Sequence, residues 1–519
     1  MSFNCKYFWT VTLEITAKII YNGIMGRTYG HLKSGTDIRG TAVGENITLT
    51  DEAVCAISRA FVKWLSVKSG KPHFKIAVGT DSRISAERML NCVKEGILSS
   101  GSDLCYTGLS STPSMFILLK KSDYGCDASV MITASHLPYD RNGLKFFTPD
   151  GGLDSEDIDE ILDIASKQDF LSGNGHYSEK PFMDEYSKLL VGLVRKSCGA
   201  ERPLEGKKII VDAGNGAGGF FTEKVLKPLG ADTDGSQFLD PDGYFPNHIP
   251  NPEDPKAIES IKRATVESKA DLGIIFDTDV DRAGAVDSNG KEINRNRLIA
   301  LLSAILLKDR KGVIVTDSVT SDGLTAFIEN SGGKHLRYMR GYKNVINKCI
   351  ELNESGVYSP LAIETSGHAA FEENYFLDDG AYVIVKLLIM LASLKEGEKL
   401  ADLIELLPEP VESDEIRITF SDTSSFREKG AAVLKEIERQ VKADKSLSLV
   451  TDNYDGVRMN SKNGWLLIRM SLHDPVMPIN IESNSIGGNR VLAKKLLNML
   501  KDFGFLNTDN LYKFIHNQV

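Results

Sequence analysis

Ser135, His136 and Lys145 are the residues whose types and spacing first suggest chemistry. They follow a short apolar run, residues 128–133, which is typical of a strand buried on both faces, so Ser135 is expected on a loop beyond that strand's carboxyl end. Asn142-Gly143 is expected to form a turn, with Lys145 beginning the return strand. Ligands bind at this edge of open α/β sheets, so the loop could hold a serine that carries a phosphate. The same residues could also form an ordinary polar turn.

A second group with chemical potential is the carboxylate series Asp277, Asp279 and Asp281, which follows an apolar run. In an extended backbone alternate side chains point the same way, so the three carboxylates are expected to converge on one hard cation, and Mg²⁺ fits. A calcium EF-hand loop is a competing interpretation, but it needs glycine where Arg282 stands and glutamate where Ser288 stands. A solvated acidic turn is the other alternative, in which the carboxylates would repel one another without a counter-ion.

The elements that would position these groups recur along the chain. Residues 74–81, 207–215 and 311–318 each contain a short β-branched run that closes at Asp, and helical patterns such as 84–98 and 220–229 follow. Recurrence at domain-sized intervals predicts three related α/β domains with mixed sheets.

A smaller α+β domain is expected after the proline-marked linker at 407–411. It should contain a strand at 415–420, a helix at about 425–442, a hairpin near Tyr454 and a closing helix near 490–503. The expected division is an N-terminal extension at 1–30 and domains at 31–200, 201–309, 310–412 and 413–519.

A dinucleotide site is the main rival interpretation. Gly214, Gly216 and Gly219 follow a predicted strand in the G-x-G-x-x-G pattern, and Asp232 and Asp234 lie at roughly the distance of the acidic residue in such sites. The helix that follows is short for that role.

Composition narrows the class of protein. The 519 residues are 42% hydrophobic, which is ample for several cores, and the net charge of −10 argues against a nucleic-acid or membrane-surface binder. Seven cysteines without C-x-x-C spacing indicate reduced thiols in an intracellular compartment, and a cytoplasmic location is expected. A monomer or homodimer is the expected assembly. The fairly apolar stretch 11–25 is interrupted by charges, which leaves an organellar or plastid targeting role open.

Several motifs together resemble one family. Thr-Ala-Ser-His-x-Pro at 133–138, followed by Asn-Gly-x-Lys at 142–145, resembles the active-serine loop of the α-D-phosphohexomutases, the phosphoglucomutase and phosphomannomutase family. The segment 34–40 resembles the family's opening motif, and 277–282 resembles its metal loop with Thr278 and Val280 in place of glycines. In this comparison the segment 214–219 resembles the start of the second domain, where the glycines serve tight packing.

Later motifs extend the resemblance. Glu-Thr-Ser-Gly-His at 364–368 is similar to the family's sugar loop, and Arg-Gly-Tyr-Lys at 340–343 matches the region that supplies a lysine near the substrate. The phosphate clamp at 469–475 keeps its arginine, serine and proline, but Leu472 and His473 replace glycine and threonine. A loop that wraps its N–H groups around phosphate often needs a glycine, so weak substrate affinity is expected.

The resemblance implies an active site in a central cleft and transfer of phosphate between C1 and C6 of glucose or mannose. Phospho-Ser135 would donate its phosphate, giving a hexose 1,6-bisphosphate, with Mg²⁺ as cofactor and a sugar phosphate as the partner. A non-catalytic, regulatory sugar-phosphate-binding relative is the alternative. The implied catalytic residues are Ser135, His136, Lys145, Arg39 and His368; the metal ligands are Ser135, Asp277, Asp279 and Asp281; and the substrate-binding residues are Arg282, Lys343, Glu364, Ser366, His368, Arg469 and Ser471.

Overall fold

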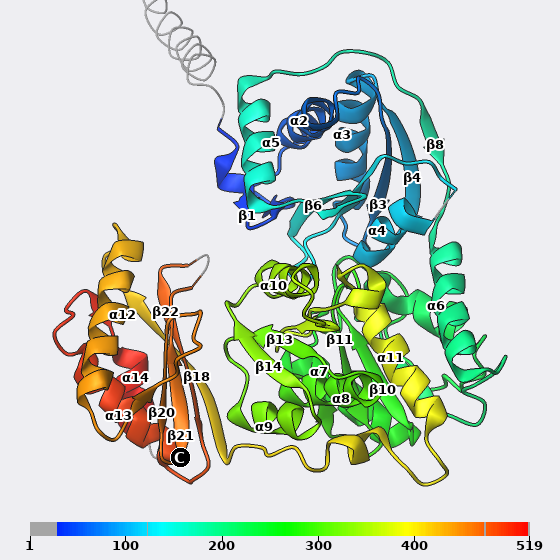
Figure 1. The fold of residues 1–519 in the computed structure, drawn as a ribbon. Coiled ribbons are helices and arrows are strands. Elements are labelled where there is room, and N and C mark those ends of the chain that lie inside the picture. The colour runs from blue at the N-terminus through cyan, green and yellow to red at the C-terminus, as the bar shows by residue number, and fades with distance from the viewer. Residues whose placement is uncertain (1–27, 122, 472–473, 517–519) are drawn as a thin grey trace, which may run out of the picture.

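The computed structural model describes residues 28–121, 123–471 and 474–516, which form four β-sheets with helices packed on them (Figure 1). Residues 1–27 of the expected N-terminal extension lie outside the described residues. We call the units that contain the sheets domains I to IV in chain order. Three α/β units with mixed sheets and a smaller α+β unit are what the sequence predicts, and this prediction is confirmed.

Domain I contains the sheet β1-β2-β6-β5-β3-β4-β8, in which β3 is parallel to β4 and β5, whereas β5, β6 and β2 are antiparallel neighbours. Its strands are β1 (Lys33–Ser34), β2 (Asp37–Thr41), β3 (Lys75–Thr80), β4 (Asp103–Leu109), β5 (Ala128–Ile132), β6 (Arg141–Thr148), β7 (Gly151–Gly152) and β8 (Tyr177–Glu179). Its helices are α2 (Asp51–Ser69), α3 (Ala86–Ser99), α4 (Thr112–Lys121), α5 (Ser155–Lys167) and α6 (Met183–Cys198).

β5, the strand that leads to Ser135, is buried over its whole length because helices cover both of its faces. Val130 and its alternate neighbours pack into a cluster with α2, α3 and α5, whereas Met131 faces the cluster that contains residues of α4 and α6. Burial on both faces explains the uninterrupted apolar run in the sequence.

The turn after β5 lies earlier than predicted. Asn142 and Gly143 already belong to β6, which begins at Arg141, so the prediction of a turn at Asn142-Gly143 is wrong and Lys145 lies within the strand. A Cβ atom at Gly143 would lie 2.3 Å from the carbonyl oxygen of Ile38 and 2.7 Å from that of Thr133. The glycine therefore permits close approach of neighbouring backbones in the sheet rather than a change of chain direction.

Domain II has the sheet β12-β11-β10-β9, in which β9 and β10 are parallel and the other pairs antiparallel. Its elements are β9 (Ile209–Asp212), α7 (Pro255–Ser268), β10 (Leu272–Phe276), β11 (Ala283–Asp287), β12 (Glu292–Ile293) and α8 (Asn296–Asp309). The helical pattern predicted at 220–229 is present in a shorter form, as a π-helix at Thr222–Leu226 and not as a regular α-helix. A short turn at Ala217–Gly219 is followed by one wide turn at Thr222–Leu226, closed by an N–H of Lys227 donating to the Thr222 carbonyl, because Pro228 cannot continue a helix.

Domain III has the sheet β14-β13-β15-β16-β17, parallel at β14-β13-β15 and antiparallel beyond. Its elements are β13 (Val313–Asp317), α9 (Asp322–Asn330), β14 (Lys334–Tyr338), α10 (Tyr342–Glu354), β15 (Leu361–Ile363), β16 (Ala369–Phe371), β17 (Leu377–Asp378) and α11 (Gly380–Ser393). β3, β9 and β13 each end at or just before an aspartate, as the repeated pattern predicts.

Domain IV is an antiparallel sheet, β19-β20-β21-β22-β18-β23, with three helices. Its elements are β18 (Glu412–Phe420), α12 (Phe426–Ala443), β19 (Ser448–Leu449), β20 (Val457–Ser461), β21 (Gly464–Ile468), β22 (Val476–Ser483), α13 (Gly488–Leu500), β23 (Leu506–Asn507) and α14 (Asp509–His516). The helix predicted near 490–503 is α13, but it does not close the chain, because β23 and α14 follow it.

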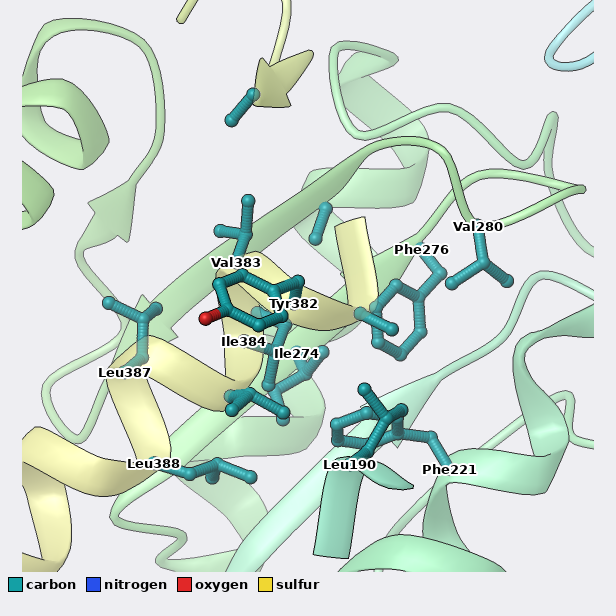
Figure 2. Packing of buried hydrophobic residues seen from close by; sticks show 14 of the residues in the cluster. Leu190, Phe221, Ile274, Phe276, Val280, Tyr382, Val383, Ile384, Leu387 and Leu388 are labelled. Atoms are coloured by element: carbon teal, nitrogen blue, oxygen red, sulfur yellow. The ribbon is translucent and has the colours of Figure 1, made fainter. Parts of the chain in front are cut away.

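One continuous apolar core joins domains I, II and III. Figure 2 shows Leu190 of α6, Phe221 and Phe276 of domain II, and Tyr382 of α11 gathered in it, together with Val280. Domain IV has a core of its own. A shared core holds the loops of the first three domains in fixed relation, so side chains from different domains can meet in one site. Among the described residues, no helix combines the length and apolarity that crossing a bilayer requires.

Candidate functional site

Ser135 lies on the loop just beyond the carboxyl end of β5, as predicted, and is only 2% exposed. Its backbone has φ of 50°, a left-handed conformation that non-glycine residues rarely adopt. The backbone N–H donates to the Thr133 hydroxyl at 2.9 Å, and the Ser135 Oγ donates to Asp277 Oδ2 at 2.8 Å. The Ser135 hydroxyl, which belongs to domain I, therefore reaches the loop of domain II that carries Asp277, Asp279 and Asp281. We call this loop the acidic loop.

Arg83, which the sequence analysis did not select, holds this loop from the end of the neighbouring strand β3. Its guanidinium donates to the Asp81 carboxylate at 3.2 Å and to four loop carbonyls. The carbonyls are those of Ser135, Leu137, Pro138 and Arg141. Every N–H of one buried guanidinium is thus used, which fixes the path of residues 133–141. We call these residues the serine loop. In the sequence, the only feature that could have pointed to this role of Arg83 is its place in Asp81-Ser-Arg83, directly after a predicted strand.

Asp277, Asp279 and Asp281 come together in the loop after β10, each at most 1% exposed, with one carboxylate oxygen of each within 4.8 Å of the others. The convergence is as predicted, but the expected extended backbone is wrong. The loop closes as a turn, in which the Val280 N–H donates to the Asp277 carbonyl and Val280 has φ of 64°. The family that this segment resembles has glycine at this position. Val280 therefore adopts the strained left-handed conformation although its side chain is β-branched.

The electrostatics of this loop fit a bound cation. Burial and the two neighbouring carboxylates hold the pKa of Asp277 well above its usual range, and burial with Asp281 raises the pKa of Asp279 to about 6. Oδ1 of Asp279 and Oδ1 of Asp281 are buried without a hydrogen-bond partner. Arg282 Nε lies 3.8 Å from Oδ1 of Asp281 and offsets part of its charge. A buried carboxylate oxygen without a hydrogen bond is costly unless positive charge is near, and oxygen ligands of this kind suit Mg²⁺.

Three cations surround the serine and the acidic loop. Lys145 Nζ lies 3.1 Å from Asp281 Oδ2 and 3.5 Å from Asp37 Oδ2. Arg282 donates to Asp277 Oδ2 at 3.2 Å and to the Ser135 Oγ at 3.3 Å. Arg39 of β2 is paired with Asp37 at 2.8 Å and lies opposite Gly143 of β6, the strand that follows the serine loop. The predicted Arg39, Lys145 and Arg282 are therefore brought together.

The two predicted histidines differ in environment. His136 Nδ1 is 3.4 Å from the Ser135 Oγ, and burial, with Arg282 and Arg39 nearby, lowers the pKa of His136 to about 2. His368 stacks on Tyr342 and pairs through Nδ1 with Asp378 Oδ2 at 2.5 Å. Although burial opposes it, the Asp378 and Asp281 carboxylates raise the pKa of His368 overall. No sequence pattern pointed to Asp378, which lies across the β16-β17 hairpin from the histidine.

The sugar-loop residues lie at the carboxyl end of β15. Glu364 accepts a hydrogen bond from the Gly341 N–H at 2.6 Å, and the Ser366 hydroxyl donates to the Glu364 carboxylate at 3.4 Å. Burial and the nearby Asp317 raise the pKa of Glu364 to about 7. Lys343 instead donates to the Gly152 carbonyl at 2.8 Å and pairs with Asp154 of domain I, so its substrate role stays a prediction.

Domain IV contributes Arg469, at the end of β21, to the same region. Its Nε lies 3.8 Å from Asp455 Oδ2, and burial, with the neighbouring Arg340, lowers the pKa of Arg469. Asp455 also accepts a hydrogen bond from the Ser318 hydroxyl of domain III at 2.7 Å. Ser471 accepts from the Asp474 N–H at 3.3 Å. Leu472 and His473, the altered clamp positions, lie outside the described residues.

A cavity of about 360 Å³ opens between domains II, III and IV, lined by Glu253, Arg295, Arg340, Thr365 and Arg417 among others. None of the residues predicted for the active site lines this cavity. Lys145, Asp281 and Lys343 instead line a smaller cavity of about 100 Å³ between domains I, II and III, so the expected site in a central cleft stays a prediction.

The glycines of the rival dinucleotide interpretation face protein rather than open space. A Cβ at Gly216 would lie 2.7 Å from the Thr278 backbone, one at Gly219 2.1 Å from the Leu239 carbonyl oxygen, and one at Gly214 2.7 Å from Pro250. Neighbouring backbone fills the space that a pyrophosphate would need. The segment serves packing against the acidic loop, and the dinucleotide interpretation is disfavoured.

Comparison with known proteins gives consistent matches. The three family descriptions "Phosphoglucomutase/phosphomannomutase, alpha/beta/alpha domain" I, II and III match residues 31–172, 184–290 and 294–411. A phosphoglucomutase of Neisseria meningitidis is 31% identical over 453 residues, covering 86% of this chain and 92% of the relative. A phosphomannomutase/phosphoglucomutase of Pseudomonas putida is 31% identical over 455 residues, covering 86% and 91%. A crystal structure of a phosphoglucomutase/phosphomannomutase family protein from Burkholderia thailandensis superimposes with a TM-score of 0.77 at 27% identity, covering 90% of this chain and 96% of that one.

Proposed function

The chain belongs to the phosphoglucomutase/phosphomannomutase family and is a phosphohexomutase, an isomerase; from that premise we propose that it exchanges phosphate between C1 and C6 of glucose or mannose through Ser135. Phosphoserine at Ser135 and a hexose 1,6-bisphosphate intermediate are the core of the proposal. The observation that carries it is the hydrogen bond from the Ser135 Oγ to Asp277, within reach of Arg282 and beside a buried carboxylate cluster.

In the first half-reaction the bond between the Ser135 Oγ and phosphorus breaks, and the phosphoryl group moves to a sugar hydroxyl, whose proton is lost. In the second, the other phosphoryl group of the bisphosphate returns to the Oγ. Arg282 and Lys145 offset the negative charge that spreads over the transferring group. Mg²⁺, held by Asp277, Asp279 and Asp281, supplies further positive charge to that group when it is bound.

The three candidates for proton transfer, His136, Lys145 and His368, differ in whether they can exchange a proton at neutral pH. The low pKa of His136 keeps its ring neutral, so it cannot act as an acid at neutral pH. The carboxylates of Asp37 and Asp281 outweigh the effect of burial and hold the pKa of Lys145 well above its usual range, so it serves as a fixed charge. We propose His368, which Asp378 holds through Nδ1 at 2.5 Å, as the group that gives and takes the proton.

Glu364 and Ser366 recognise the sugar. The Glu364 carboxylate accepts hydrogen bonds from sugar hydroxyls, and the Ser366 hydroxyl can donate one to them. Arg469 and Ser471 hold the phosphate that does not react, since a mutase must grip it through both half-reactions. A purely regulatory, non-catalytic role is not favoured, because the relatives are named as mutases.

A coupled assay of the purified protein on the 1-phosphates of glucose, mannose and glucosamine, with Mg²⁺ and a bisphosphate activator, tests the proposal. Ser135→Ala should lose nearly all turnover on every substrate. Ser129→Ala is the matched control, because Ser129 is a buried serine of β5 that donates only to the Met115 carbonyl. Turnover of Ser135→Ala equal to that of the control would refute the proposed mechanism.

A further inference from the structure

Thr112, at the start of α4 in domain I, makes two hydrogen bonds to one residue of the acidic loop in domain II. Its Oγ1 donates to Asp279 Oδ2 at 2.5 Å, and its backbone N–H donates to the Asp279 carbonyl oxygen at 2.8 Å. Thr112 is 4% exposed and Asp279 is fully buried. Side chain and backbone of Asp279 are therefore both fixed from the domain that carries Ser135.

The two oxygens of the Asp279 carboxylate have different surroundings. Oδ2 is occupied by the Thr112 hydroxyl, whereas Oδ1 is buried and has no hydrogen-bond partner. A donor on one oxygen sets the rotation of the carboxylate about its Cβ–Cγ bond and so decides where the free oxygen points. Groups that fix metal-ligating carboxylates in this way tune metal affinity strongly.

The hydroxyl of Thr112 is not required by its own helix. Ser111 performs the capping, because its Oγ accepts a hydrogen bond from the Ser114 N–H at 3.3 Å. The Thr112 hydroxyl is thus free to cross to domain II, where its partner lies 167 residues away in the sequence.

We infer that Thr112 is a positioning residue that orients Asp279 for the cation and aligns the acidic loop with the domain of Ser135. The inference rests on the proposed Mg²⁺ site. Because Thr112 acts through Asp279, its loss should weaken metal binding more than it lowers the rate at saturating metal.

Isothermal titration of the purified protein with Mg²⁺, together with turnover as a function of Mg²⁺ concentration, tests this role. Thr112→Val removes the hydroxyl at similar size and should weaken Mg²⁺ affinity about tenfold or more. Thr112→Ser keeps the donor and should restore affinity to within about threefold of the natural protein. At saturating Mg²⁺ the valine variant should regain most of its turnover.

Thr107→Val is the matched control. Thr107 is also buried, but its hydroxyl donates to the Val78 carbonyl and contacts the Ser110 hydroxyl and the Met115 sulfur, all within domain I. It should leave Mg²⁺ affinity unchanged. Thr112→Ala serves in place of the valine variant if the latter does not fold, with the same expected loss.

Asp279→Asn separates failure of this inference from failure of the metal assignment. Unchanged Mg²⁺ affinity in Thr112→Val, beside a clear loss in Asp279→Asn, would overturn the role of Thr112 and leave the metal site standing. Unchanged affinity in Asp279→Asn as well would overturn the metal site itself.

Discussion

Replacing Arg83 by lysine should loosen the loop that carries Ser135 while leaving the protein folded. The guanidinium makes five hydrogen bonds, one to Asp81 and four to loop carbonyls, whereas a lysine ammonium has three donors. At least two acceptors therefore lose their partner, and an unsatisfied buried acceptor costs about 1–3 kcal/mol. The Pro138 carbonyl belongs to an exposed residue and can turn to water, which leaves one unsatisfied buried acceptor and an expected loss of about 1–3 kcal/mol.

Such a loss is smaller than the total stability of a domain, about 5–15 kcal/mol, so Arg83→Lys should fold. The Ser135 hydroxyl would no longer be held to one position, and misplacement of a reacting group by about 1 Å can lower the rate roughly a hundredfold. We therefore expect kcat to fall by about tenfold to a hundredfold while KM changes little, and amide hydrogen exchange to accelerate over residues 133–141.

Arg88→Lys is the control for this prediction. Arg88 of α3 also bonds a carboxylate and two carbonyls, those of Asp51, Ala42 and Leu49, but it is partly exposed and these partners lie outside residues 133–141. It should leave both kcat and exchange of residues 133–141 unchanged. Natural exchange protection and natural kcat in Arg83→Lys would refute the role assigned to the guanidinium.

Three further predictions concern strain, pH and the fourth domain. At Val280, with φ of 64°, the glycine variant should be more stable than the alanine variant by about 1 kcal/mol in thermal unfolding, the reverse of the usual order, and an alanine variant that is the more stable would contradict it. Burial raises the pKa of Glu482 from 4.5 to about 7, so its contribution to stability is complete below about pH 4.5 and is lost as pH rises through about 7. Glu482→Gln should therefore flatten the melting temperature across that range, and an unchanged pH profile would show that Glu482 does not titrate there. Arg469→Ala should raise KM more than tenfold, since a charge-assisted bond is worth about 1.5–3 kcal/mol, whereas Leu472→Gly with His473→Thr should lower it, and unchanged KM in both would remove this loop from phosphate binding.

Local pattern was enough to predict much of the fold and of the site. The apolar run before Ser135 and the one before Asp277 end where strands end, because burial on both faces requires such runs. The predicted turn at Asn142-Gly143 was wrong, since pairing with β2 overrides the local preference of Asn-Gly. The prediction of an extended backbone in the acidic loop was wrong because Val280 adopts a conformation that its residue type disfavours.

The residues that sequence reasoning missed act over long separations in the chain. Arg83 reaches carbonyls more than fifty residues away, and Thr112 reaches Asp279 across two domains. Asp378 meets His368 only because β16 and β17 pair as antiparallel neighbours. No periodicity or local motif encodes such contacts, which arise when the sheets and the shared core are assembled.

Peptide mass spectrometry of the active protein tests the phosphoserine directly. After incubation with a hexose 1,6-bisphosphate and Mg²⁺, the peptide that contains Ser135 should carry one phosphate on that residue, and the label should be discharged when a hexose phosphate is added. Ser129→Ala should be labelled like the natural protein, and Ser135→Ala should not be labelled. Full turnover with no phosphate on Ser135 at any stage, or an equal yield of label in Ser135→Ala, would contradict transfer through this serine.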